Sequence, residues 1–393
     1  MPISPEIQAL ASDMRLWRQQ IHSQPETAFQ EHKTANFVVE LLRSWDIEVH
    51  TGIGQTGVVG VIHGSLGSGP TIAFRADMDA LPIVEEGQPS YRSVHHGVFH
   101  GCGHDGHTAI LLGTARLLAE RRDFSGTVVL IFQPAEEIIQ GSRAMLDDGL
   151  LQRFPFEEIY ALHNHPALAA GTVGVRRGAA LASVDFFSIR IIGVGSHGGM
   201  PHLSVDPIMI GSSLVAALQS IVSRNVNPIE NAVISVCSFQ SGETNNVIPE
   251  FAVLDGTVRT LSVAVRKQVV ERMREVCQGL ALAHQCQIEM TLANNTPPTV
   301  NSPEQTQHVI RAAKLVVGAD KLQENVAPIM AGDDCAVFLQ ERPGCYFLLG
   351  QDGPMCHHPH YDFNDDVASI GVAMFRQLVD LRLGSGRDDN NNN

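Results

Sequence analysis

The chain has 393 residues, of which 44% are hydrophobic and 18% charged, a composition that predicts two or three folded domains and excludes a disordered protein. Its net charge of −15 argues against a nucleic-acid or anionic-membrane partner, because both bind basic surfaces. The acidic balance identifies no partner by itself, so any function has to be inferred from motifs.

The first half of the chain alternates between helical and strand patterns. Helical apolar spacing occurs over residues 6–22, 31–45, 107–122 and about 141–151. Buried-strand patterns lie between or after these segments, at 56–64, 70–80 and 157–166, and at 127–137 a strand runs into a turn. This alternation predicts an α/β layer built on a largely parallel sheet.

The pattern changes near Ala182. Strands are expected at 183–195, 232–239, 251–261 and 286–295, and helices at 205–224 and 263–284. The order strand-helix-strand-strand-helix-strand is the split βαβ pattern. Residues 182–293 therefore predict an inserted α+β domain with an antiparallel sheet.

After residue 294 the earlier pattern returns. Helices are predicted over 302–317, 332–341 and 364–383, with a buried strand at 344–350. We expect residues 1–181 and 294–384 to form one discontinuous domain around the insertion. The polar, low-complexity tail at 385–393 is expected to be disordered.

The N-terminus and the cysteines predict a cytoplasmic protein. The first twenty residues lack a basic segment followed by an apolar core, and no stretch approaches the ~20 apolar residues of a membrane span. The seven cysteines are an odd number without framework spacing, which favours reduced thiols over disulfides.

Potential metal ligands gather where the predicted strands end, the usual place for an α/β site. Asp77 and Asp79 close the strand at 70–80, although aspartate is also common in strand-exit turns. The next segment, HGCGHDGH, places Cys102, His104 and His107 among glycines. Thiolate and imidazole are strong ligands, and glycine lets the backbone wrap around a small ion. The alternative is a glycine-rich loop with a reduced thiol and surface histidines.

Three further patterns follow later strands. Glu136 and Glu137 are adjacent carboxylates leaving a buried strand, which is costly unless a cation neutralises them or one is protonated. One could bind metal while the other abstracts a proton, and a solvated acidic turn is the alternative. His163 follows a buried strand, and His357 and His358 lie in a histidine-rich loop. Each pattern is weak alone, but together they predict one metal site.

These residues and their surroundings resemble the M20 family of metallopeptidases, in the amidohydrolase branch that includes hippurate hydrolases, N-acyl-amino-acid amidohydrolases and auxin-conjugate hydrolases. The matching motifs occur in family order over nearly the whole chain: RADMDALP, HGCGHDGHT, FQPAEE, LHNHP, SHGGMPH, NNVIP, GTVRT and HHPHYDFND. The resemblance implies an α/β dimetal catalytic domain with a mixed, largely parallel sheet, interrupted by a ferredoxin-like α+β lid through which the protein can form a homodimer or higher homo-oligomer. It also implies hydrolysis of the amide bond of small N-acyl amino acids.

The resemblance further implies a role for each site residue. Two divalent ions (Zn, Mn, Co or Ni) would be held by a bridging Cys102 and by His104, Glu137, His163 and His357. Glu136 would be the general base, Asp79 the acid that orients the site, and His197 the residue that stabilises the oxyanion. Asn246 and Arg259 would contact substrate, and the fork of Arg259 suits a carboxylate. His358 competes with His357 for the last position, and the spacing before Pro359 favours His357.

The chain departs from the family pattern at three positions. Asp77 stands where the wider family often has histidine, so we expect Asp77 not to be a ligand. Gly198-Gly199 after His197 replaces the usual Ala-Ala and could alter lid flexibility. Gly332-Asp333-Asp334-Cys335 replaces a Ser-Glu-Asp-Phe-like stretch and could reshape the acyl pocket.

Other functions remain as hypotheses. The runner-up is deacetylation of an N-acetyl amino acid of a biosynthetic pathway, such as N-acetyl-diaminopimelate. A non-catalytic metal- or peptide-binding protein is disfavoured because Glu136 and all five ligands are present. A nicotinamide or flavin enzyme is disfavoured because no GxGxxG motif opens a helix after the first strand.

Overall fold

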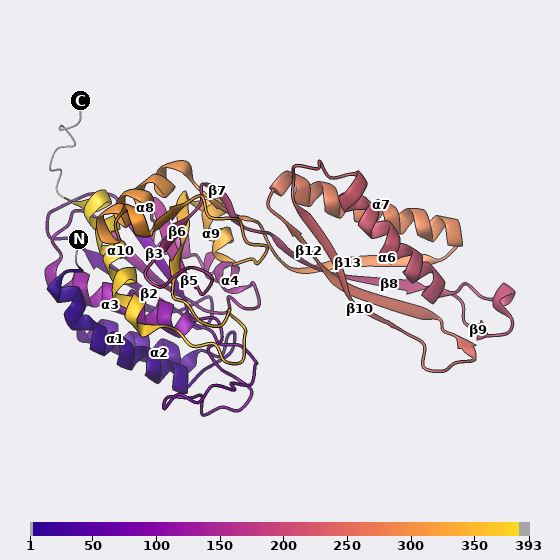
Figure 1. The fold of residues 1–393 in the computed structure, drawn as a ribbon, viewed down its shortest axis with the longest axis horizontal. Coiled ribbons are helices and arrows are strands. Elements are labelled where there is room, and N and C mark those ends of the chain that lie inside the picture. Colours follow the sequence, from indigo (N-terminus) through magenta and orange to yellow (C-terminus); the bar gives the residue numbers. More distant parts are fainter. Residues whose placement is uncertain (1–2, 385–393) are drawn as a thin grey trace. The chain divides into compact units, whose positions relative to one another are not determined.

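The computed structural model describes residues 3–384 and divides the chain into two compact units (Figure 1). Unit 1 extends to Ala180 and also contains Val300–Ala327 and the chain from Asp333 onward. Unit 2 consists of Leu181–Thr299 and Pro328–Gly332. The tail predicted to be disordered, 385–393, lies outside the described residues.

Unit 1 is built on a mixed eight-stranded sheet in the order β1-β2-β4-β3-β5-β16-β6-β15. Its strands are β1 (Glu48–Ile53), β2 (Gly57–His63), β3 (Thr71–Asp77), β4 (Thr127–Gln133), β5 (Glu158–His165), β6 (Val173–Val175), β15 (Leu322–Glu324) and β16 (Gly344–Gly350). The central strands β4, β3, β5 and β16 are parallel and almost wholly buried. Burial on both faces is what their continuous apolar runs predict.

Helices cover both faces of this sheet. The larger core cluster joins the strands to α1 (Pro5–Ser23), α2 (His32–Ser44), α3 (His104–Arg121), α8 (Pro303–Val316) and α10 (Ala368–Leu383). The smaller cluster, on the other side of the strands, joins them to α4 (Gly141–Asp147), α5 (Leu150–Arg153) and α9 (Cys335–Glu341). Side chains alternate along a strand, so that Phe74 of β3 packs in the first cluster and Ala73 in the second.

Unit 2 contains a four-stranded antiparallel sheet with two helices. Its elements are β8 (Val184–Ile192), α6 (Pro207–Arg224), β10 (Ala232–Ser241), β12 (Phe251–Thr260), α7 (Val263–His284) and β13 (Gln287–Thr296). The strand order β10-β12-β8-β13 is that of a ferredoxin-like fold. Both helices start at a capping side chain, Asp206 for α6 and Ser262 for α7, and pack their apolar residues into one core with the sheet.

Helix α6 departs from the expectation that no segment could span a membrane. It is long and apolar enough to do so by length and composition, with a mean hydropathy of 1.2. Of this helix 33% is buried, including Ile210, Leu214 and Leu218, which pack in the core of unit 2.

The remaining elements are short, and most were not predicted. They are β7 (Gly178–Leu181), β9 (Ser196–His197), β11 (Val247–Ile248), β14 (Thr299–Asn301) and the 3₁₀ turns Pro201–Leu203, Ala319–Lys321 and Asp365–Val367. The segment 127–137 was predicted to be a strand running into a turn, and the strand ends at Gln133, because Pro134 lacks an N–H group and Ala135 has a φ of 51°. The helix predicted near 141–151 is divided at Gly149, whose φ is 83°.

Candidate metal centre

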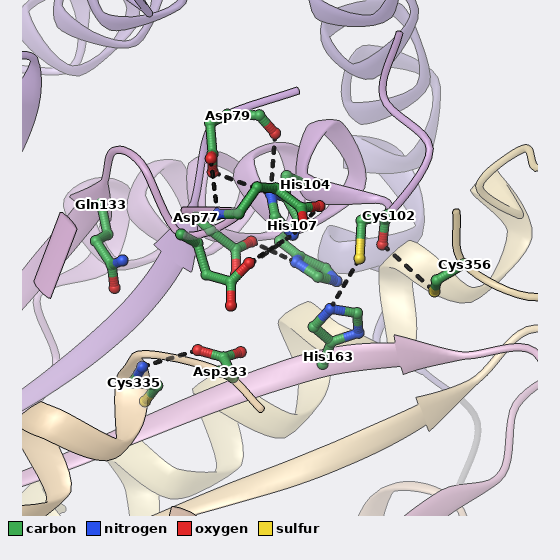
Figure 2. Close-up of polar contacts among 12 residues, drawn as sticks. Asp77, Asp79, Cys102, His104, His107, Gln133, His163, Asp333, Cys335 and Cys356 are labelled. Atoms are coloured by element: carbon green, nitrogen blue, oxygen red, sulfur yellow. Dashed lines mark hydrogen bonds and ion pairs between the residues drawn. The ribbon is translucent and has the colours of Figure 1, made fainter. Parts of the chain in front are cut away.

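Three of the predicted ligands, Cys102, His104 and His163, lie together where the central strands end (Figure 2). Asp77 is the last residue of β3, and His163 lies near the end of β5. His104 is the first residue of α3, and Cys102 precedes it in a loop in which Gly103 has a φ of 92°. An added Cβ at Gly103 would lie 2.2 Å from the Asn164 side chain, so this loop requires glycine.

Two sets of three potential ligands share the Cys102 thiol. The donor atoms of Cys102, His104 and His163 all lie within 4.8 Å of one another, and so do those of Cys102, Glu137 and His357. In the first set Cys102 Sγ is 3.5 Å from Nε2 of His163. In the second, Oε2 of Glu137 is 3.5 Å from Nε2 of His357. The five predicted ligands are therefore neighbours, with the thiol common to both sets.

His357 and His358 are distinguished by their surroundings. His357 has a φ of 69°, an unusual conformation for a residue other than glycine, and its ring lies against Glu137. His358 instead accepts a hydrogen bond at Nδ1 from the backbone N–H of His360. The geometry thus favours His357 over His358 as the last potential ligand, in agreement with the sequence spacing before Pro359.

Two atoms of this cluster are buried without a hydrogen bond. Among the described residues, His104 Nε2 and Glu137 Oε1 have no hydrogen bond, and they lie 3.8 Å apart. The other ring nitrogen of His104, Nδ1, lies 2.9 Å from the backbone oxygen of Asp79, which leaves Nε2 directed into the cluster. Buried polar atoms are almost always satisfied, so this pair fits a bound cation.

The adjacent glutamates differ in their electrostatic surroundings. Burial raises the pKa of Glu136 well above its ordinary value, and the nearby charges of Asp333 and Glu137 raise it further. Burial acts in the same direction on Glu137, but the hydrogen bond to His357 and the charge of His104 outweigh it and lower the pKa of Glu137. Neighbouring carboxylates whose pKa values are pushed apart are suited to different tasks.

A buried arginine was missed as an organising residue by the sequence analysis. Arg75 is 1% exposed, and its guanidinium contacts Asp77 at 2.6 Å, Asp333 at 3.1 Å and Asp334 at 3.4 Å. Gln133 accepts a further hydrogen bond from Nε at 2.8 Å. An arginine inside a buried strand requires carboxylate partners, although that requirement alone does not indicate which of the chain's acidic residues supply them.

Asp77 and His107 contact each other beside the cluster (Figure 2). Asp77 contacts Arg75 through one oxygen and Nδ1 of His107 through the other, each at 2.6 Å. Burial opposes ionisation of Asp77, but the charge of Arg75 outweighs it and holds the pKa of Asp77 well below its ordinary value. Both oxygens of Asp77 are thus engaged by neighbouring side chains, and that Asp77 is not a ligand stays a prediction.

Three predicted site residues belong to unit 2, and the structure does not group them with the cluster in unit 1. His197 of β9 pairs with Val247 of β11, and Gly198 donates its N–H to the carbonyl of Asn246 at 2.8 Å, so His197 and Asn246 are neighbours. Arg259 on β12 donates to the Thr257 hydroxyl at 3.0 Å. No carboxylate of the described chain forms an ion pair with Arg259, and burial lowers its pKa.

Comparison with known proteins identifies relatives over the whole chain. The model of peptidase family M20/M25/M40 matches residues 73–381. Hippurate hydrolase from Campylobacter jejuni is 38% identical over 380 residues, covering 96% of this chain and 99% of the relative. N-acetyl-L-cysteine deacetylase from Bacillus subtilis is 40% identical over 361 residues, covering 91% and 85%. A crystal structure of a dinuclear metal-binding M20 peptidase from Bacillus subtilis is similar with a TM-score of 0.83 and 33% identity, over 95% of this chain and 98% of that one.

Proposed function

The chain belongs to the M20 peptidase family, in its amidohydrolase branch, and we propose that it hydrolyses the amide bond of N-acyl amino acids to release a carboxylic acid and a free amino acid. The observation that carries this proposal is the pair of ligand sets sharing Cys102 beside the carboxylate of Glu136. The names of the two relatives also support it, because hippurate and N-acetyl-L-cysteine are both N-acyl amino acids.

The cluster fits two divalent metal ions. We propose that Cys102, His104, Glu137, His163 and His357 would hold them, the Cys102 thiol being common to both ligand sets. Thiolate together with imidazole and carboxylate suits Zn, Mn, Co or Ni. Bound ions of this kind supply Lewis acidity to the amide carbonyl and to the attacking water.

Glu136 is the proposed general base. It lies at the edge of the cluster, with Oε2 3.9 Å from Nε2 of His104, and burial raises its pKa above that of an ordinary carboxyl group, which favours uptake of a proton. Its carboxylate accepts the proton of the water that attacks the carbonyl carbon. It then donates this proton to the nitrogen of the amine that leaves when the C–N bond breaks.

We propose that unit 2 serves as the lid that the family resemblance implies. His197 would stabilise the oxyanion, Asn246 would contact the substrate, and Arg259 would bind its carboxylate. Arg259 suits this task because it has no carboxylate partner among the described residues. We also propose that the protein forms a homodimer through unit 2, which analytical ultracentrifugation tests. We further propose a cytoplasmic location, which cell fractionation tests.

The experiment that tests the activity combines metal analysis with a substrate panel. The purified protein is assayed on amino acids carrying acetyl, longer aliphatic and benzoyl groups, and on N-acetyl-diaminopimelate. We expect hydrolysis of several N-acyl amino acids, with about two metal ions per chain. Activity confined to N-acetyl-diaminopimelate would instead support the biosynthetic deacetylase, and no amide hydrolysis by the metal-loaded protein would contradict both.

A further inference from the structure

Glu31 is a buried carboxylate that contacts the acidic turn from a distant part of the sequence. It lies just before α2 and is fully buried. Its Oε1 accepts the backbone N–H of Ala135 at 2.8 Å and that of Phe29 at 3.1 Å. Its Oε2 accepts the hydroxyl of Thr56 at 2.5 Å. The side chain is therefore fixed against the residue that immediately precedes Glu136.

Ala135 needs such support because of its backbone conformation. Its φ of 51° is in the left-handed region, which is unfavourable for any residue with a Cβ. The turn is also tight, since an added Cβ at Gly141 would lie 1.6 Å from the carbonyl oxygen of Pro134. The direction in which the next two side chains leave the backbone depends on this one strained residue.

The turn is held by carboxylates on both sides of Glu136. Glu31 accepts the N–H of Ala135, and Asp79 accepts the N–H of Glu137 at 2.9 Å. The two segments that carry these carboxylates also contact each other. The backbone carbonyl of Glu26, in the loop that leads to Glu31, accepts the N–H of Ala80, the residue after Asp79, at 2.8 Å. Because the N–H groups of Ala135 and Glu137 are both bound, the backbone of Glu136 between them has little freedom to move.

We infer that Glu31 is a positioning residue for the hydrolysis, acting through Ala135 to hold the left-handed turn that directs Glu136 and Glu137 into the metal cluster. The inference rests on the proposed function, which assigns these glutamates their roles. A purely structural contact is the competing explanation. A structural contact predicts a loss of stability alone, whereas a positioning role predicts a loss of kcat in protein that is still folded.

The test compares Glu31→Ala and Glu31→Gln with a matched control. Glu158→Gln is that control, because Glu158 is a buried carboxylate of the same unit, bonded to Arg382 and Gln305 at the opposite end of β5 from His163. For each variant, kcat and KM are measured on metal-loaded protein. Metal affinity is measured separately by competition with a chelator.

Glu31→Ala should lower kcat about 10- to 100-fold with little change in KM, because small displacements of catalytic groups cost that much. It should also weaken metal binding, since Glu137 follows Glu136 in the turn. Glu31→Gln should recover most of both losses, because its amide oxygen can still accept the N–H of Ala135. Glu158→Gln should lose thermal stability while keeping kcat and metal affinity.

Two results would overturn the inference: wild-type kcat and metal affinity in folded Glu31→Ala, or no recovery in Glu31→Gln. If Glu31→Ala does not fold, Thr56→Val removes only the donor to Oε2 and should lower kcat several-fold, and an unchanged kcat would then overturn it. Glu136→Gln separates this inference from the proposed function. Full activity of Glu136→Gln contradicts the proposed function, whereas inactive Glu136→Gln beside active Glu31→Ala contradicts only the positioning role.

Discussion

Glu137 donates its backbone N–H to Oδ2 of Asp79 at 2.9 Å. The other oxygen of Asp79 lies 3.2 Å from Nδ1 of His104. One carboxylate therefore contacts one member of each ligand set, because His104 belongs to the first set and Glu137 to the second. Residues that orient metal ligands in this way commonly contribute a large part of metal affinity.

Replacing Asp79 with asparagine should weaken metal binding about 10- to 100-fold. The amide presents an NH₂ group where one carboxylate oxygen now faces a donor, so either Glu137 or His104 loses its partner. Chelator competition measures the effect. Asp185→Asn is a suitable control, because Asp185 is a buried aspartate of unit 2 paired with Arg266. Equal metal affinity in wild type and Asp79→Asn would show that Asp79 does not support the ligands.

The sequence predicted the cluster well because its ligands follow predicted strands. The ends of parallel strands meet at one edge of a sheet, so Asp77 of β3, the glutamates after β4 and His163 of β5 were expected to lie close together. The strand-helix-strand-strand-helix-strand order of unit 2 could also be predicted from the sequence, because its helices and strands have clear apolar periodicity.

The supporting residues could not be predicted in the same way. Glu31 contacts Ala135 across more than a hundred residues, and Asp333 meets Arg75 from the far end of the chain. Neither contact leaves a local periodic signal. Strand β1 was not predicted because it is mostly exposed and polar. The grouping of Pro328–Gly332 with unit 2 was also not predicted, and it involves hydrogen bonds from Ala182 to Ile329 and Ala331.

Glu136→Gln should retain the metal ions and lose about 10²- to 10⁴-fold in kcat, the usual cost of removing a general base. The amide keeps the size of the side chain but cannot accept the proton of the attacking water. Metal content and kcat are measured on the same preparation. A parallel loss of metal would make Glu136 a ligand and would require the roles of Glu136 and Glu137 to be exchanged.

Arg259→Ala should weaken hydrolysis of N-acyl amino acids strongly while hardly affecting the matching N-acyl amino-acid amides. The amides lack the carboxylate that the guanidinium is proposed to bind. The measurement is kcat/KM on such paired substrates, with thermal unfolding as the structural control. Equal losses on acid and amide, together with reduced stability, would remove Arg259 from the substrate site.

His22 should make the stability of the protein pH-dependent. Burial lowers the pKa of His22, but hydrogen bonds to Asp105 at 2.8 Å and Glu85 at 3.2 Å outweigh this and raise it from 6.5 to about 9. The stabilisation is therefore complete below pH 6.5 and is lost as the pH rises through 9, and it amounts to on the order of 3 kcal/mol. Urea unfolding of wild type and His22→Gln at both pH values measures it. A difference in unfolding free energy that stays constant between them would contradict this account.

The most direct test of the central claim is a titration of metal into the metal-free protein while hydrolysis of an N-acyl amino acid is followed. The shared Cys102 and the buried atoms of His104 and Glu137 that lack a hydrogen bond predict that chelation abolishes turnover. They also predict that activity returns in full at about two equivalents of a divalent transition metal per chain. Full activity in protein shown to contain no metal would contradict the account.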